Sequence, residues 1–182
     1  MLPAQDYCEM LRRRGEERHI VQRVKLDAID RRILEELRDD GRITNVELAR
    51  RIGISAPPCL RRVRALEKAG FIRGYHADLN AEQLGYALTV FAWVGLHSQH
   101  ESDLEAFEAL ARSWPMVREC HMLTGEADFI LKVVARDWDT WLTFLTTELT
   151  PAPNVASVKS APVLRRSKTE FGVPLDAVDD SE

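Results

Sequence analysis

One short stretch of the sequence concentrates side chains that bind nucleic acids. Successive residues of a helix point about 100° apart. A helix over residues 56–68 would turn an apolar face inward, and its opposite face would present or flank four cations: Arg61, Arg62, Arg64 and Lys68. Guanidinium and ammonium groups bind phosphates, and arginine also pairs with guanine edges. We therefore expect this helix to contact double-stranded DNA.

The residues before this helix predict the rest of a helix-turn-helix. A first helix over residues 45–52 has one apolar face, formed by Val46, Leu48, Ala49 and Ile52. Gly53 supplies the conformational freedom for the turn, and the Ser55 hydroxyl is expected to accept hydrogen bonds from the first N–H groups of the second helix. Pro57 and Pro58 fall where a helix has no backbone donors to lose. We expect Ser55, Pro57 and Pro58 to contact DNA together with the four cations.

An earlier helix and a later extended segment complete the expected DNA-binding domain, residues 25–76. Leu26, Ile29, Ile33 and Leu37 recur at helical spacing. Asp27 is placed to cap the start of this helix, and residues 39–41, Asp-Asp-Gly, end it. After Gly70, residues 71–79 are expected to form a short strand or wing, and residues 80–85 a brief helical turn.

Charge is divided unevenly along the chain. Residues 50–76 hold seven basic and one acidic side chain, a net +6, whereas residues 77–182 hold 8 basic and 17 acidic ones, a net −9. The whole-chain charge of −4 conceals this division. A basic patch beside an acidic body indicates that one segment meets a polyanion and another does not.

Composition excludes several other classes of protein. No run of about 18 apolar residues exists, and the N-terminus lacks the apolar centre of a signal peptide, so we expect a cytoplasmic protein. Three widely spaced cysteines and five scattered histidines predict reduced thiols, no metal site and no cofactor. Residues 1–24, with mixed charges and few apolar side chains, are expected to form a flexible arm. Residues 176–182 are expected to be a tail.

The second half of the chain changes its periodicity. The pattern of residues 86–97 predicts a strand that is apolar on both faces. It is followed by a helix from about Glu101, strands over 116–123 and 129–135, a helix over 137–149 and a strand over 154–164. This βαββαβ order predicts a ferredoxin-like domain, residues 86–175, with both helices on one face of a four-stranded antiparallel sheet. A linker over residues 77–85 is expected to join this domain to the DNA-binding domain. Together the two domains give the chain an α+β fold. Because the first strand is apolar on both faces, we expect a second subunit to cover the other face, giving a homodimer.

These stretches, in this order, resemble the Lrp/AsnC family of leucine-responsive and asparagine regulators. The resemblance covers about residues 26–175 and rests on LDAIDRRILEELRDDGR, ELARRIGIS, LRRVRALEKAGFIRGYHADLN, the glycine of QLGY, VRECHMLTGEADFILKV and the closing VPL. It implies an N-terminal winged helix-turn-helix and a ferredoxin-like domain that binds an effector. It also implies transcriptional regulation in response to an amino acid, dimers that form through the sheets, and in many cases octamers.

The family's effector motif, Gly-Asp-x-Asp, corresponds here to the turn between the second and third expected strands of this domain. We expect effector contacts from this turn: Thr124, Gly125, Glu126, Ala127 and Asp128. A glycine lets backbone N–H groups approach a ligand carboxylate, and Asp128 could receive an α-ammonium group. The chain has Glu126 where aspartate is common, which leaves ligand size open. The alternative is a plain β-turn in which Asp128 only satisfies local N–H groups.

Two other functions remain open at this point. Some proteins with this fold, the siroheme decarboxylases, are tetrapyrrole enzymes, although the four cations of residues 61–68 argue against that role. A metabolite-binding module without DNA contact is the second alternative. No catalytic residues are identified, and we expect a regulator that is not an enzyme.

Overall fold

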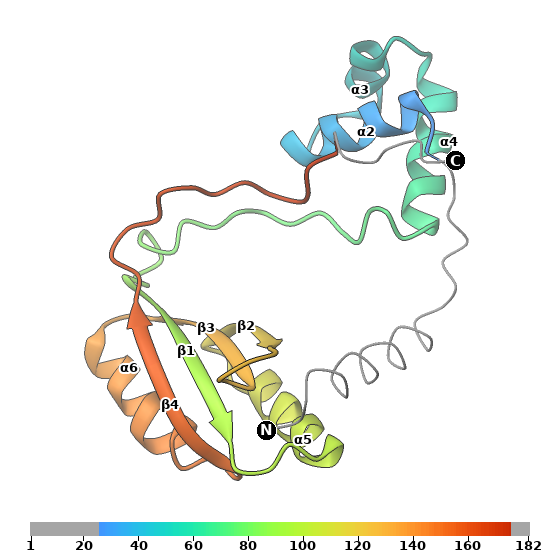
Figure 1. Ribbon diagram of the computed structural model, residues 1–182. Helices are drawn as coiled ribbons and strands as arrows, with labels where there is room; N and C mark the ends of the chain where they lie inside the picture. The colour runs from blue at the N-terminus through green and yellow to red at the C-terminus, as the bar shows by residue number, and fades with distance from the viewer. Residues whose placement is uncertain (1–25, 176–182) are drawn as a thin grey trace. The chain divides into compact units, whose positions relative to one another are not determined.

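The computed structural model describes residues 26–175 of the chain. The expected arm and tail, residues 1–24 and 176–182, lie outside them. Within the described residues, 26–78 group with 168–175 in one compact unit, and 79–167 form another. We call these the helical unit and the sheet unit and describe each by itself (Figure 1).

The helical unit has three helices packed on a small apolar core. They are α2 (Ala28–Asp39), α3 (Asn45–Ile52) and α4 (Ala56–Lys68). The core is formed by one set of buried side chains: Ile33, Leu48, Ala49, Ile52, Cys59 and Leu66. Asp27 caps α2 as expected, in a reciprocal capping box with Asp30, and α3 ends at Gly53 with a positive φ of 78°. The expected helix-turn-helix and its preceding helix are confirmed.

Three local details of the helix-turn-helix differ from expectation. Val46 is 70% exposed and does not belong to the inner face of α3. On α4 the buried positions are Cys59 and Leu66, while Leu60 is exposed. Ser55 begins α4 but its side chain makes no capping hydrogen bond. The physical reason is that a capping oxygen accepts from the second or third helical N–H, and both of these residues are prolines.

The expected strand over residues 71–79 is absent; the described backbone there is irregular, with no strand pairing. A strand needs a neighbour for its N–H and C=O groups, and this stretch has none among residues 26–175. Ile72 nevertheless packs on the helical core, and the Tyr75 hydroxyl donates to Glu67 on α4 at 3.0 Å. The expected turn over residues 80–85 is present, closed by the bond from Leu84 N–H to the Asn80 carbonyl.

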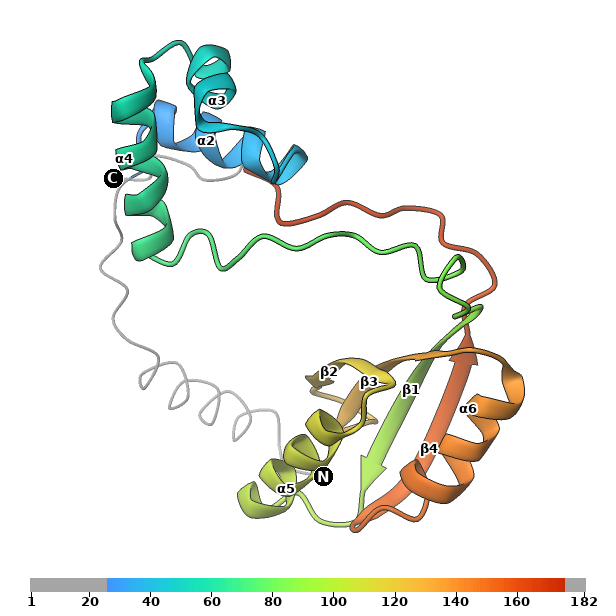
Figure 2. The same ribbon diagram turned by 180° about the vertical axis from the view of Figure 1, so that it is seen from behind.

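The sheet unit has the expected ferredoxin-like order of elements. It contains β1 (Leu88–Leu96), α5 (Glu101–Ser113), β2 (Val117–Met122), β3 (Phe129–Ala135), α6 (Trp138–Phe144), the π-helical turn η1 (Leu145–Leu149) and β4 (Val155–Pro162). The strands pair antiparallel in the order β2-β3-β1-β4. Figures 1 and 2 show α5 and α6 on the same face of this sheet. The main core lies between the sheet and these helices.

The last helix deviates from the expected register. A continuous α-helix over residues 137–149 would bury Trp138 and Leu142, but these side chains are 49% and 39% exposed. The core takes Trp141, Phe144 and Leu149 instead. Trp138 and Leu142 precede the π turn and lie to one side of the buried face, which is centred on Trp141 and Phe144. The π turn widens the helix after Phe144, and Leu149 at its end is again buried.

Within the sheet unit, no helix covers the opposite face of the sheet. Alternate residues of β1 point there, and their neighbours across the register do so too: Thr89, Phe91, Trp93 and Gly95 with Ile130, Lys132, Val134, Ser157, Lys159 and Ala161. Phe91 and Trp93 are only half-buried, whereas Val90, Ala92 and Val94 on the helix-covered face are fully buried. The helices of the sheet unit therefore cover a single face of a strand that is apolar on both.

Candidate DNA-binding helix and effector pocket

The solvent-facing side of α4 carries three unpaired cations. Arg61, Arg64 and Lys68 are exposed. Among the described residues, none of the three has an ion pair or a side-chain hydrogen bond. Ser55 and Pro57 are exposed near the start of the same helix, and Pro58 is half-buried there. These groups are free to meet phosphates or base edges.

Arg62 differs from the other three cations. Its Nη1 donates to Asp27 Oδ2 at 2.7 Å and to Asp30 Oδ1 at 2.8 Å, both at the start of α2. The hydrogen bonds that Arg62 donates to Asp30 and Asp27 raise the pKa of its guanidinium above the usual value. The structure thus turns Arg62 inward, away from the side of α4 on which the sequence analysis put it.

The arginines of α3 are also engaged within the helical unit. Arg50 and Arg51 both donate to the carboxylate of Glu47, and Arg51 also donates to Glu36. Hydrogen bonds from Arg50 and then Arg51 lower the pKa of Glu47 from 4.5 to about 2. Much of the local positive charge is therefore balanced internally, and α4 holds most of the free remainder.

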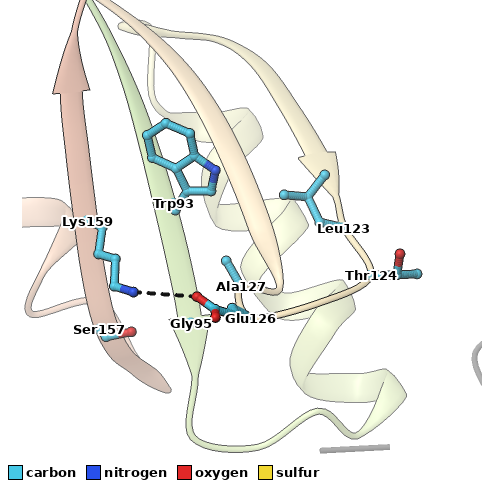
Figure 3. A pocket seen from close by; sticks show the side chains of 8 residues that line it. All are labelled: Trp93, Gly95, Leu123, Thr124, Glu126, Ala127, Ser157 and Lys159. Carbon is cyan, nitrogen blue, oxygen red and sulfur yellow. Dashed lines mark ion pairs between the residues drawn. The ribbon is translucent and has the colours of Figure 1, made fainter. Parts of the chain in front are cut away.

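A second candidate site is a hollow of about 280 Å³ on the helix-free side of the sheet (Figure 3). It is lined by residues of β1, β4 and the turn between β2 and β3: Trp93, Gly95, Leu123, Thr124, Glu126, Ala127, Ser157 and Lys159. Gly95 keeps the base of the hollow open, since a Cβ there would approach Ser157 Oγ to 2.7 Å. The expected turn therefore contributes three of its five residues to the lining.

Glu126 and Lys159 supply opposite charges at this hollow. Their Oε2 and Nζ atoms lie 3.8 Å apart, and both side chains are largely exposed (Figure 3). A loose, solvated pair of this kind contributes little stability. Its partners can be separated at low cost and can bind the ammonium and carboxylate groups of a zwitterion.

Asp128 and Gly125 do not line the hollow. Asp128 is 4% exposed, and its two oxygens accept from the Leu96 N–H and from Gln99 Nε2, each at 2.7 Å. Its carboxylate thus ties the turn to the end of β1 and is not open to a ligand ammonium in this arrangement. Gly125 has a φ of 133°, so the backbone conformation rather than a close neighbour requires glycine there.

The sequence analysis missed Trp93, Ser157 and Lys159 as pocket residues. The register brings them together, since Trp93 pairs with Lys159 and Gly95 with Ser157. These pairs join positions more than sixty residues apart in the sequence. Alternation along β1 indicates which residues share a face, but it does not identify the partner strand.

Comparisons with known proteins identify the type of each of the two domains. Residues 26–73 match the sequence profile of a winged helix-turn-helix DNA-binding domain, and residues 89–173 match that of the Lrp/AsnC ligand-binding domain. The chain belongs to the Lrp/AsnC family of DNA-binding transcriptional regulators. A leucine-responsive regulatory protein of Rhizobium meliloti is 56% identical over 149 residues, covering 82% of this chain and 96% of the relative. That of Escherichia coli K12 is 40% identical, covering 79% and 87%.

Solved structures give the same result. A Neisseria meningitidis transcriptional regulator in complex with L-Met superposes with a TM-score of 0.80 at 37% identity, covering 84% of this chain and 98% of that one. AsnC of E. coli superposes with a TM-score of 0.75 at 29% identity, covering 82% and 99%. These relatives are regulators, in line with the expectation of a regulator rather than an enzyme.

Residues 26–175 contain no helix that is long and apolar enough to cross a membrane. In the same residues, no cluster of three or more His, Cys, Asp and Glu side chains could hold a metal ion.

Proposed function

We propose that the regulator reads DNA with the exposed side of α4. Arg61, Arg64 and Lys68 supply unpaired positive charge, and Ser55, Pro57 and Pro58 bring the start of the helix close to the duplex. This assignment depends on one observation: cations that have no partner among residues 26–175 gather on the second helix of a helix-turn-helix, the element that enters the major groove in such domains.

The operator is unknown, so the protein itself should select the test duplex. Selection from a random-sequence library gives a probe, and fluorescence anisotropy at fixed salt then gives its Kd. We expect binding at least about 10³ times tighter to the selected duplex than to random DNA of the same length. Equal affinity for both would contradict sequence-specific recognition.

We further propose that the hollow on the sheet binds an amino acid. Glu126 would accept hydrogen bonds from the α-ammonium, and Lys159 with Ser157 would bind the α-carboxylate. Trp93 and Leu123 offer apolar surface to the ligand side chain. Thr124 and Ala127 complete the wall, while Gly125 and Asp128 shape the turn. The opposite charges of Glu126 and Lys159 at one small hollow support this choice, as does the L-Met complex of the Neisseria relative.

A thermal-shift panel of the twenty amino acids tests this proposal. A ligand that binds only the folded state raises the free energy of unfolding by RT ln(1 + [L]/Kd), about 2.7 kcal/mol at a hundredfold excess over Kd. We expect one or a few amino acids to raise the melting temperature. A flat panel, followed by calorimetry that detects no heat of binding, would contradict an amino-acid effector.

We also propose that the regulator acts as a dimer built on the helix-free face of the sheet. Phe91, Trp93 and Val134 on that face are apolar, and a second copy would cover them. Two α4 helices in a symmetric dimer imply half-sites about one helical turn, or a multiple, apart. We further propose that these dimers can assemble into octamers and that the protein works in the cytoplasm.

The alternative function, a tetrapyrrole enzyme, predicts a different result: the protein would show a Soret band when titrated with a porphyrin.

A further inference from the structure

We propose that Arg62 positions α4 for DNA binding by fastening it to α2, and does not itself contact DNA. The inference builds on the proposed role of α4 and concerns one of the four cations that the sequence places on it. Arg62 is the central residue of the helix Ala56–Lys68. A fastening at the middle of a helix controls how the helix is oriented as well as where it lies.

The contacts of Arg62 are specific. One terminal nitrogen donates to two carboxylates, Asp27 Oδ2 at 2.7 Å and Asp30 Oδ1 at 2.8 Å. The Arg62 side chain is 33% exposed and that of Asp30 only 16%. To reach a phosphate, Arg62 would have to leave both partners, and Asp30 would lose its ion pair in a site that water reaches poorly. That cost is greater for a half-buried carboxylate than for a solvated one.

The charge balance leads to the same conclusion. One guanidinium against two carboxylates leaves this cluster with a net charge of −1 rather than a positive one. Arg61, the residue before Arg62, has no such partner among the described residues and faces solvent. Two adjacent arginines therefore have different roles, one facing outward to a polyanion and one inward to α2.

The partners of Arg62 are themselves fixed. Asp27 and Asp30 form the capping box of α2, in which each side chain accepts a backbone N–H of the other residue. Arg32, also on α2, donates to the Arg51 carbonyl at the end of α3 at 2.9 Å. Arginine contacts thus join α2 to both helices of the helix-turn-helix: Arg32 and Arg51 join it to α3, and Arg62 joins it to α4.

The test uses the full-length protein and the duplex that it selects from a random library. The variants are Arg62→Ala, Arg62→Lys, Asp30→Asn and, as the matched control, Arg61→Ala. Kd is measured by anisotropy over a series of KCl concentrations. Each lost phosphate contact lowers the slope of log Kd against log salt by about 0.9, whereas lost positioning weakens binding with the slope unchanged.

We expect Asp30→Asn to weaken binding about fivefold or more, although it removes a negative charge that repels DNA. Arg62→Ala should weaken binding with the wild-type salt slope, and Arg62→Lys should do the same because an ammonium does not reproduce the guanidinium geometry. The double variant Arg62→Ala/Asp30→Asn should bind no more weakly than the weaker single variant. Arg61→Ala alone should lower the slope, by about 0.9 for each bound helix.

A different pattern overturns the inference. If Asp30→Asn binds as tightly as wild type or more tightly, or if Arg62→Ala lowers the salt slope as Arg61→Ala does, Arg62 is a phosphate contact. Arg62→Lys keeps the charge and serves as the readout if the alanine variant fails to fold: full affinity in Arg62→Lys also indicates a phosphate contact. The proposed role of α4 fails separately, if Arg61→Ala changes neither affinity nor slope.

Discussion

At the residue scale, the structure separates side chains that the sequence treats alike. Arg61 and Arg62 are adjacent arginines on one helix, and only their partners distinguish them: solvent for Arg61, and Asp27 with Asp30 for Arg62. Those partners lie 35 and 32 residues away in the sequence. Helical periodicity assigns a direction to within tens of degrees, and a long flexible side chain can turn either way from there. The sequence therefore predicted a cluster of cations on this helix, but it could not predict which of the two arginines faces solvent.

The same scale gives a prediction for the effector pocket. Lys159→Ala and Glu126→Gln each remove one of the two charges that we assign to the ligand's backbone groups. Each should weaken binding of the amino acid found by thermal shift by about 1–3 kcal/mol, as expected for a lost charge-assisted hydrogen bond. Isothermal titration calorimetry measures this, with Lys168→Ala as the control because Lys168 is an exposed lysine outside the hollow. Wild-type affinity in both pocket variants would move the ligand elsewhere.

At the element scale, most boundaries followed from local signals. Asp27 and the Asp-Asp-Gly sequence mark the ends of α2, and alternation marks β2 and β3, because caps and periodicity involve only near neighbours. The failures depended on tertiary contacts. The stretch over residues 71–79 has no pairing partner among the described residues, and packing on the sheet centres the buried face of α6 on Trp141 and Phe144 instead of on Trp138 and Leu142.

The N-caps of α3 and α4 differ, which predicts different effects of cap substitutions on the stability of the two helices. The Thr44 side chain accepts from the Glu47 N–H at 3.2 Å, whereas the Ser55 side chain makes no capping bond. Thr44→Ala should therefore destabilise α3 by about 0.5–2 kcal/mol, and the matched Ser55→Ala change should alter α4 by less than about 0.5 kcal/mol. Native-state hydrogen exchange of the amides in each helix measures both effects. A larger loss for Ser55→Ala would mean that its hydroxyl has a capping role that the two prolines should prevent.

At the scale of the whole molecule, the helices of the sheet unit cover one face of the sheet and leave the other open to a second subunit. The sequence predicted the composition of both faces of β1, but a single chain cannot show what covers the second. We expect Phe91→Glu, which puts a charge on that face, to shift the protein from dimer toward monomer in light scattering. Leu142→Glu is the control, since Leu142 is exposed on α6, on the opposite side of the sheet. A dimer that survives Phe91→Glu and dissociates with Leu142→Glu would place the interface on the helices.

The central claim is that exposed cations on α4 read DNA in this Lrp/AsnC regulator. The most direct test is the Kd of the selected duplex at fixed salt for wild type and for the triple variant Arg61→Ala/Arg64→Ala/Lys68→Ala. Among the described residues these side chains make no ion pair and no side-chain hydrogen bond, and all three are exposed, so the variant should melt like wild type. Its affinity should fall at least about a hundredfold, from lost base and phosphate contacts of about 1–3 kcal/mol each. A folded triple variant that binds the duplex as tightly as wild type would contradict the claim.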